Sequence, residues 1–315
     1  MLKIIIPVYK ARATLPKTLD SLVAQTKSMF LVTLVQDCDN EDYSDIIEEY
    51  RRRGLKIEIM TLNENGGPGV ARQAGMDNDQ MCDYFMFVDS DDMLTPMAVD
   101  ILYREAKKRK ADVVTSDIFK EETHQGGLLM DWEHTPCTWT HGKIYSASYL
   151  RENNIRFPID IRLNEDSYFN LVAINSTQNK FGIHHVTYIW RDNPNSLTRC
   201  ESPTDFFKRS WKQYIKSQVY GLTDIGIICK EIDVQLIART LLNIYYHCMT
   251  ATYLKLDTNI QILSELKNNI AIQNAFNNQV FWEVINSELK GSKMLGDQLF
   301  FFKISFIDWL NTYIR

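Results

Sequence analysis

The sequence predicts an α/β fold, with a mostly parallel sheet flanked by helices and a helical C-terminal appendage. Two observations lead to this prediction. The first 110 residues alternate short apolar runs with stretches of helical pattern, and four such strand–helix units imply a parallel sheet with helices on both faces. After about residue 200, glycine and proline become rare and long helical patterns dominate. We therefore expect two domains, residues 1–200 and 201–315.

The expected elements follow in chain order. The four strand–helix units place strands at 2–6, 31–35, 56–61 and 84–88, and helices at 14–25, 43–53, 69–76 and 96–110. The mixed segment after them suggests strands at 113–119 and 181–190, and short helices at 146–153 and 165–174. The last third predicts helices at 204–221, 231–254, 258–268, 279–290 and 297–313.

Composition narrows the class of protein. A net charge of −5 argues against a general polyanion binder, and 45% hydrophobic residues supply a substantial core. The six cysteines form no Cys-x-x-Cys pair, which fits reduced thiols in a cytosol. The apolar run at the N-terminus is too short for a signal peptide, and no stretch has the length of a membrane span. We expect a cytoplasmic protein, soluble or held peripherally at a membrane surface.

Three carboxylates directly follow the fourth predicted strand. Asp89, Asp91 and Asp92 lie within four residues, and like charges this close repel one another and resist burial. Hard oxygen ligands at the end of a strand suit Mg²⁺ or Mn²⁺, which usually share their shell with phosphate oxygens. The alternative is an acidic turn in which Asp92 caps a helix that begins near Thr95. This segment alone leaves both interpretations open.

Polar clusters also follow the other three strands of the repeating units. They lie at residues 7–9, 37–39 and 63–67. Ligands of parallel sheets bind at the carboxyl ends of the strands. We therefore expect these loops and the acidic segment to meet around one site.

Six segments, taken in order, carry a resemblance to a known family. They are Ile4–Tyr9, Val35–Asp42, Asn65–Arg72, Asp89–Asp92, Asn164–Phe169 and Tyr188–Arg199. Over about residues 1–200 they resemble glycosyltransferase family 2, the inverting enzymes with the GT-A nucleotide-sugar-binding fold. The resemblance implies a GT-A catalytic domain at 1–200 that moves a sugar from a nucleotide-diphospho-sugar to an acceptor hydroxyl. The Gln-x-x-Arg-Trp motif of processive polymerases is absent, which favours a single transfer.

The resemblance also assigns the chemistry to particular carboxylates. Asp91, with Asp89, would ligate a Mn²⁺ or Mg²⁺ ion that neutralises the charge of the leaving diphosphate. Asp166 would be the general base that takes the proton of the acceptor hydroxyl. Glu165 is the second expected catalytic-site residue, binding acceptor or orienting a loop. An acid-rich helix N-terminus is the alternative reading of this pair.

Further residues are implied to bind the nucleotide-sugar. Asp37 would accept a hydrogen bond from the base, which is expected to be uracil, while Tyr9 would stack on that base. The segment Trp139–Lys143 is similar to an acceptor-side stretch of the family. Cys38 and Asp39 replace the usual Gly-Ser, so the base-binding turn is expected to differ. The full expected set of nucleotide-sugar contacts is Pro7, Tyr9, Asp37, Arg72, Asp89, Asp92, Arg191 and Ser196.

Several functions remain open at this stage. The first is a glycosyltransferase with a UDP-linked donor and a glycan, a lipid-linked sugar, a wall polymer or a protein as acceptor. A modified base in phage DNA is another acceptor, suggested by bases and aromatics interleaved over 206–216, although a solvated helix face explains that pattern too. The apolar segment 299–310 suggests core packing, a homodimer seam or a membrane contact. A non-catalytic nucleotide-sugar binder is the alternative from another class, and a nucleotidyltransferase is a third.

Overall fold

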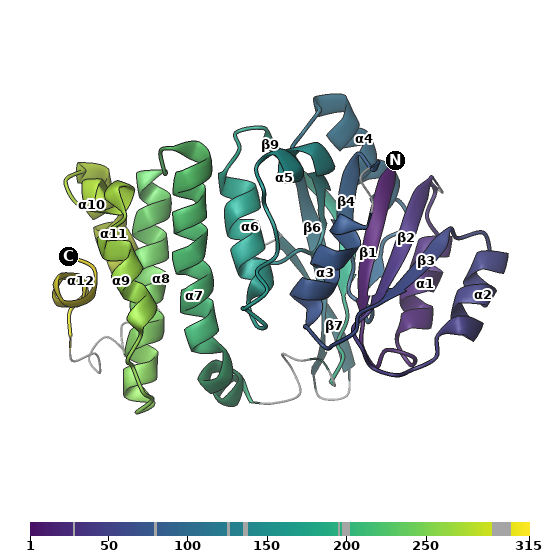
Figure 1. Ribbon diagram of the computed structural model, residues 1–315, viewed down its shortest axis with the longest axis horizontal. Coiled ribbons are helices and arrows are strands. Elements are labelled where there is room, and N and C mark those ends of the chain that lie inside the picture. Colours follow the sequence, from purple (N-terminus) through teal and green to yellow (C-terminus); the bar gives the residue numbers. More distant parts are fainter. Residues whose placement is uncertain are drawn as a thin grey trace. The chain divides into compact units, whose positions relative to one another are not determined.

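The computed structural model describes residues 1–27, 29–78, 81–124, 127–134, 138–194, 196, 202–291 and 304–315. By internal packing the chain divides into two compact units, Met1–Cys200 and Glu201–Arg315. Figure 1 shows the sheet of the first unit in purple to teal and the helices of the second in green to yellow.

The first four strands form the parallel part of one sheet. They are β1 (Leu2–Val8), β2 (Phe30–Gln36), β3 (Ile57–Thr61) and β4 (Tyr84–Phe87), in the spatial order β3-β2-β1-β4. Ile4 lies opposite Val32 of β2 and Met86 of β4. A central strand is covered on both faces, which is why β1 is apolar at nearly every position. The parallel sheet predicted from the repeating units is confirmed.

Helices cover both faces of these strands. They are α1 (Leu15–Val23), α2 (Ser44–Arg52), α3 (Pro68–Asp77) and α4 (Ala98–Arg109). Ile4 and Ile6 of β1 join a core with residues of α1, α2 and α4. Ile5 points to the opposite face, where Gly75 allows α3 to approach it closely. The alternation of side chains along β1 therefore places α3 on the opposite face of the sheet from α1, α2 and α4.

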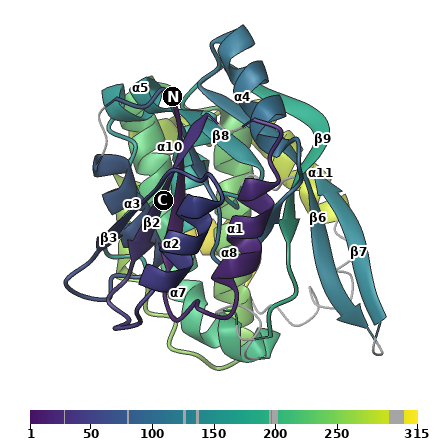
Figure 2. The same cartoon turned by 90° about the vertical axis from the view of Figure 1, so that its right-hand side faces the viewer.

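The sheet continues with strands that are partly antiparallel. They are β5 (Met93–Leu94), β6 (Val113–His124), β7 (Gly127–His134), β8 (Lys143–Ser146) and β9 (Lys180–Trp190). β8 joins β4 to β6 by antiparallel pairing, and β9 lies parallel to β6. β6 and β7 form a long ribbon (Figure 2). The short helices α5 (Ala147–Glu152) and α6 (Glu165–Asn175) occur where they were predicted, whereas β5, β7 and β8 were missed.

The second unit is helical, as expected. Its elements are α7 (Pro203–Cys229), α8 (Val234–Tyr253), η1 (Gln261–Leu263), α9 (Ser264–Lys267), α10 (Ile270–Ala275), α11 (Gln279–Gly291) and α12 (Phe306–Tyr313). The helix predicted over 297–313 is shorter here, because α12 begins only after Ser305, whose side chain caps it. Residues 297–303 of that prediction lie outside the described residues.

The basic and aromatic segment 206–216 lies on α7. Trp211 and Ile215 are buried, whereas the ammonium groups of Lys208 and Lys212 pair with Asp205 and Asp257. This is the pattern of an amphipathic helix with a solvated face. Across the described parts of the chain, no helix combines the length and apolarity needed to cross a membrane.

Candidate active site

The loops that follow β1 and β2 are tied to each other, and the β2 loop is tied to the one after β3. The backbone N–H of Lys10 donates to Asp39 at 2.5 Å. The carboxylate of Asp37 accepts from the backbone N–H groups of Gly66 and Gly67, each at 2.8 Å. These bonds bring the three loops to one edge of the sheet, as their positions after parallel strands predicted.

Asp37 shapes the turn that leads into α3. The side chain is buried, and each of its two oxygens is taken by one glycine amide. Gly67 adopts a φ of 85°, a conformation that side chains with a Cβ rarely take. The role expected of Asp37 toward a nucleotide base stays a prediction, and its observed partners give it a structural role as well.

Tyr9 and Cys38 lie in the loops beside this turn, where Tyr9 is exposed and Cys38 has an unusual backbone conformation. Tyr9 is 48% exposed, so its ring has a face available for stacking. Cys38 has a φ of 54°, in the left-handed region that glycine ordinarily occupies. The thiol donates to the carbonyl of Asn63 at 3.4 Å. The chain therefore keeps the backbone geometry of a glycine turn and adds a side chain there. Pro7 lies at the end of β1, opposite Val35.

Arg72 of α3 bridges two carboxylates from distant parts of the chain. One guanidinium nitrogen lies 2.6 Å from Oδ1 of Asp89, and the other lies 2.8 Å from Oε1 of Glu165. The Arg72 side chain is only 5% exposed. Burial alone would raise the pKa of Asp89, but the charges of Arg72 and His141 outweigh it and hold that pKa below its ordinary value. Arg72 was expected near the base or diphosphate, and its bridge joins α3, the acidic turn and α6.

Gly69 is the close neighbour that lets Glu165 reach Arg72. A Cβ on Gly69 would lie 2.6 Å from Cγ of Glu165. We predict that Gly69→Ala destabilises the protein by about 1–3 kcal/mol, because Glu165 must move off its bridge. Urea unfolding measures the effect. Gly182→Ala is the control, since its Cβ would meet Thr115 at an ordinary 3.6 Å. Equal stability of the two variants would contradict the prediction.

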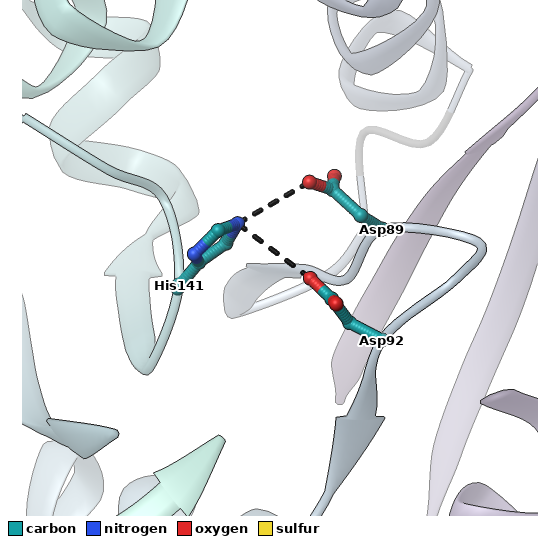
Figure 3. A group of neighbouring side chains, drawn as sticks. All are labelled: Asp89, Asp92 and His141. Carbon is teal, nitrogen blue, oxygen red and sulfur yellow. Dashed lines mark hydrogen bonds and ion pairs between the residues drawn. The ribbon is translucent and has the colours of Figure 1, made fainter. Parts of the chain in front are cut away.

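His141 completes a cluster with two of the three aspartates that follow β4. Its Nε2 lies 3.2 Å from Oδ2 of Asp89 and 3.8 Å from Oδ2 of Asp92 (Figure 3). One potential ligand atom from each residue lies within 4.8 Å of the others. The imidazole stacks on the ring of Tyr188, with centroids 4.5 Å apart and planes at 12°. The sequence placed His141 only in an acceptor-side stretch, because it lies 49 positions after Asp92 in the chain.

Asp92 does not cap a helix, so the interpretation of the acidic segment as a helix-capping turn is wrong. Its carboxylate accepts from the hydroxyl of Tyr188 at 2.7 Å and from the backbone N–H of Arg191 at 2.9 Å. The chain first forms β5 beside β9, and α4 begins only at Ala98. Burial, together with the charges of Asp91 and Asp89, raises the pKa of Asp92 well above its ordinary value. Asp92 therefore anchors the end of β9 to the acidic turn.

Asp91 lies beside the cluster without belonging to it. Its Oδ2 accepts from the side-chain amide of Asn193 at 2.8 Å. Burial first, and the charge of Asp89 second, raise the pKa of Asp91. Asn193 belongs to the segment that also carries Arg191 and Ser196, and the backbone N–H of Ser196 donates to the Asn193 carbonyl at 3.1 Å. The contact between Asp91 and Asn193 brings this segment to the acidic turn.

Glu165 and Asp166 open α6 and differ in their surroundings. Glu165 is buried against Arg72, and burial, followed by the charge of Asp166, raises its pKa to about 7. Asp166 is only partly buried, and it accepts from the backbone N–H of Ser167 at 2.8 Å. Burial also raises the pKa of Asp166, although Arg72 opposes the shift. A carboxylate with a raised pKa and partial exposure is suited to accept a proton.

A family model, glycosyl transferase family 2, matches residues 3–163, which is about half of the chain. The chain belongs to this family, and it is a glycosyltransferase. The family predicted from the six segments is thereby confirmed.

Curated relatives agree with this assignment. The chain is 27% identical to "Uncharacterized glycosyltransferase EpsJ" of Bacillus subtilis over 252 residues, which cover 73% of each chain. It is 31% identical to a poly(ribitol-phosphate) beta-glucosyltransferase of Bacillus spizizenii over 55% of this chain. It is 26% identical to the poly(ribitol-phosphate) beta-N-acetylglucosaminyltransferase TarS of Staphylococcus aureus over 65% of this chain. The matches span only 29% and 38% of these last two proteins.

Solved structures show the same fold. S. aureus TarS 1-349 in complex with UDP-GlcNAc superposes with a TM-score of 0.65 at 19% identity, covering 92% of each chain. The mannosyltransferase PcManGT of Pyrobaculum calidifontis, in complex with GDP-Man and Mn²⁺, superposes with a TM-score of 0.53 at 10% identity, covering 93% of this chain and 87% of that one. At these identities the likeness shows the fold alone, and it confirms the predicted GT-A architecture.

Proposed function

We propose that this glycosyltransferase is inverting and metal-dependent, and that it moves a sugar from a UDP-linked donor to a hydroxyl of a glycan or polymer acceptor. The observation that carries the proposal is the convergence of Asp89, Asp91, Asp92 and Asp166 with Arg72 and His141 at the carboxyl ends of the strands. The UDP-GlcNAc in the TarS complex and the polyol-phosphate acceptors in the names of two relatives support the donor and acceptor classes.

The residues at the acidic turn fit a divalent cation. Carboxylate oxygens of Asp89 and Asp92 and Nε2 of His141 converge, and oxygen with imidazole nitrogen is a donor set that Mn²⁺ accepts. Arg72 occupies only Oδ1 of Asp89, so Oδ2 remains directed at His141. These three residues would hold the ion, and Asp91 of the same turn, the ligand expected from the sequence, would supply a further carboxylate to it. When bound, such an ion supplies positive charge to the departing diphosphate.

The chain's own groups account for the remaining requirements of the reaction. Asp166 takes the proton of the attacking hydroxyl, and its partial exposure gives an acceptor access to it. Arg72 fixes the first residue of α6 relative to the acidic turn, and therefore holds the base at a constant distance from the leaving group. Tyr9 offers its exposed ring to the nucleotide base.

We predict that Asp91→Asn removes the metal-dependent part of donor binding. The substitution leaves the Arg72 bridge intact, because Asp91 hydrogen-bonds to Asn193 while Arg72 pairs with Asp89. In a thermal-shift assay, UDP-GlcNAc should stabilise the native protein more with Mn²⁺ than with EDTA. A donor at a hundred times its Kd contributes about 2.7 kcal/mol. The extra stabilisation by Mn²⁺ should vanish in Asp91→Asn, and an unchanged increment would contradict the metal assignment.

A non-catalytic nucleotide-sugar binder would give a different result. It would show the same thermal shift and would release no UDP in any mixture of donor, Mn²⁺ and polyol-phosphate or glycan acceptor. The transferase should release UDP in step with sugar transfer.

A further inference from the structure

A fully buried lysine lies at the start of β8, directly after the loop that carries His141. Lys143 has no exposed surface. Its ammonium donates to the backbone carbonyl of Trp139, and also to that of His141 at 3.4 Å. An ammonium group is costly to bury unless hydrogen bonds replace its hydration. Both of these carbonyls belong to the loop of residues 138–142, which we call the His141 loop.

The same loop is held at two more carbonyls. The carbonyl of Gly142 accepts from both the backbone N–H and the hydroxyl of Ser116, each at 2.8 Å. The carbonyl of Thr138 accepts from the side-chain amide of Asn170 at 3.2 Å. Gly142 has a φ of 62°, and a Cβ there would lie 2.8 Å from the Ser116 hydroxyl oxygen. Together with Lys143, these contacts hold the loop from β6, β8 and α6.

These contacts of the loop backbone determine where the side chain of His141 lies. His141 is buried, its ring lies flat on Tyr188, and its Nε2 faces Asp89 and Asp92. Its Nδ1 has no hydrogen-bond partner among the described residues. The hydrogen bond that usually fixes a ligating imidazole from behind is therefore not provided there. The backbone of the loop, rather than a partner on the ring, must set where the imidazole lies.

We propose that Lys143 is a positioning residue, whose buried ammonium holds the His141 loop so that the imidazole faces the acidic turn. The purpose of this placement, cation binding by His141, rests on the proposed function. The hydrogen bonds from Lys143 to the His141 loop are present whether or not the site binds a cation. Lys143 itself acts through His141 and the loop carbonyls.

Two measurements test this role. In metal-free protein labelled with ¹⁵N-histidine, the His141 ring signals are identified among six histidines by their loss in His141→Asn. Lys143→Met should shift these signals, because the ring loses its stacked position on Tyr188. In the presence of UDP, the same variant should bind Mn²⁺ about tenfold more weakly in a calorimetric titration, as changes behind a metal ligand generally do.

Lys3→Met is the matched control. Lys3 is also fully buried in a strand of the same sheet, and its ammonium pairs with Glu58 at 3.1 Å. This variant should leave the His141 signals and the Mn²⁺ affinity unchanged. If Lys143→Met gives no folded protein by circular dichroism, Lys143→Gln keeps one donor group and should produce a smaller shift of the same signals.

Unchanged His141 signals in folded Lys143→Met, or in Lys143→Gln in its place, would overturn the inference. A shift of equal size in Lys3→Met would overturn it as well, because the effect would then belong to any buried lysine. A wild-type protein that binds no Mn²⁺ with UDP would count against the proposed function alone. The ring signals would still decide whether Lys143 positions His141.

Discussion

Asp166→Asn should lower kcat by about 10²–10⁴-fold, the range expected when a general base is removed. The donor Kd should stay within about twofold, because the side chain of Asp166 hydrogen-bonds to the backbone of Ser167, and Arg72 keeps its bridge between Asp89 and Glu165. An asparagine keeps the size of the side chain and its acceptor oxygen for Ser167, so the start of α6 should persist. Steady-state transfer kinetics and donor titration measure the two effects separately.

The matched control is Asp100→Asn. Asp100 is also an acid in the first turn of a helix, α4, where it pairs with Arg104. If Asp166 only complements a helix N-terminus, the two variants should behave alike, with small losses of stability and full transfer. Near-normal transfer by Asp166→Asn would reject the assignment of the base.

Arg72→Met should destabilise the protein by about 3–5 kcal/mol, the cost of removing one partner from a buried charge network. The substitution leaves Glu165 buried and Asp89 half-buried without the guanidinium that pairs with both of them. Arg104→Met is the control, since that arginine is exposed and its pair with Asp100 should contribute less than about 1 kcal/mol. Urea unfolding gives both values.

The double variant Arg72→Met with Glu165→Gln tests the physical reason for this cost. Removing the charge of Glu165 should recover part of the lost stability, because one uncompensated carboxylate is gone. A double variant that loses the sum of the two single costs would show that Arg72 stabilises the fold by packing rather than by its bridge.

Much of the fold could be predicted because its signals are local. The first four strands are continuous apolar runs, and each is followed by a helical pattern. The alternation of strand and helix along the chain therefore predicts that the strands pair in parallel. β5 has two residues and β8 has four, with a charged lysine at the start, so neither carries a strand pattern. The ribbon partner β7 mixes acids with exposed Leu128 and Trp132, which hides its alternation.

The carboxylates of the candidate site could be predicted from the sequence, whereas most of the residues that contact them could not. Asp89, Asp91 and Asp92 stand out because three like charges follow a buried strand. The bridge from Arg72 to Glu165 joins residues 93 positions apart, so no local sequence pattern could predict it. The cap reading of Asp92 was wrong because β5 separates it from α4. His141 reaches the aspartates only through a loop fixed by Lys143 and Ser116, which are tertiary contacts.

The most direct measurement of the central claim is the anomalous signal of manganese in crystals grown with UDP and Mn²⁺. The account predicts one peak about 2.0–2.6 Å from carboxylate oxygens of the turn at Asp89–Asp92, with the UDP diphosphate against it and Asp166 facing the same space. UDP bound at the strand ends with manganese elsewhere, or with Asp166 turned away from the diphosphate, would contradict it.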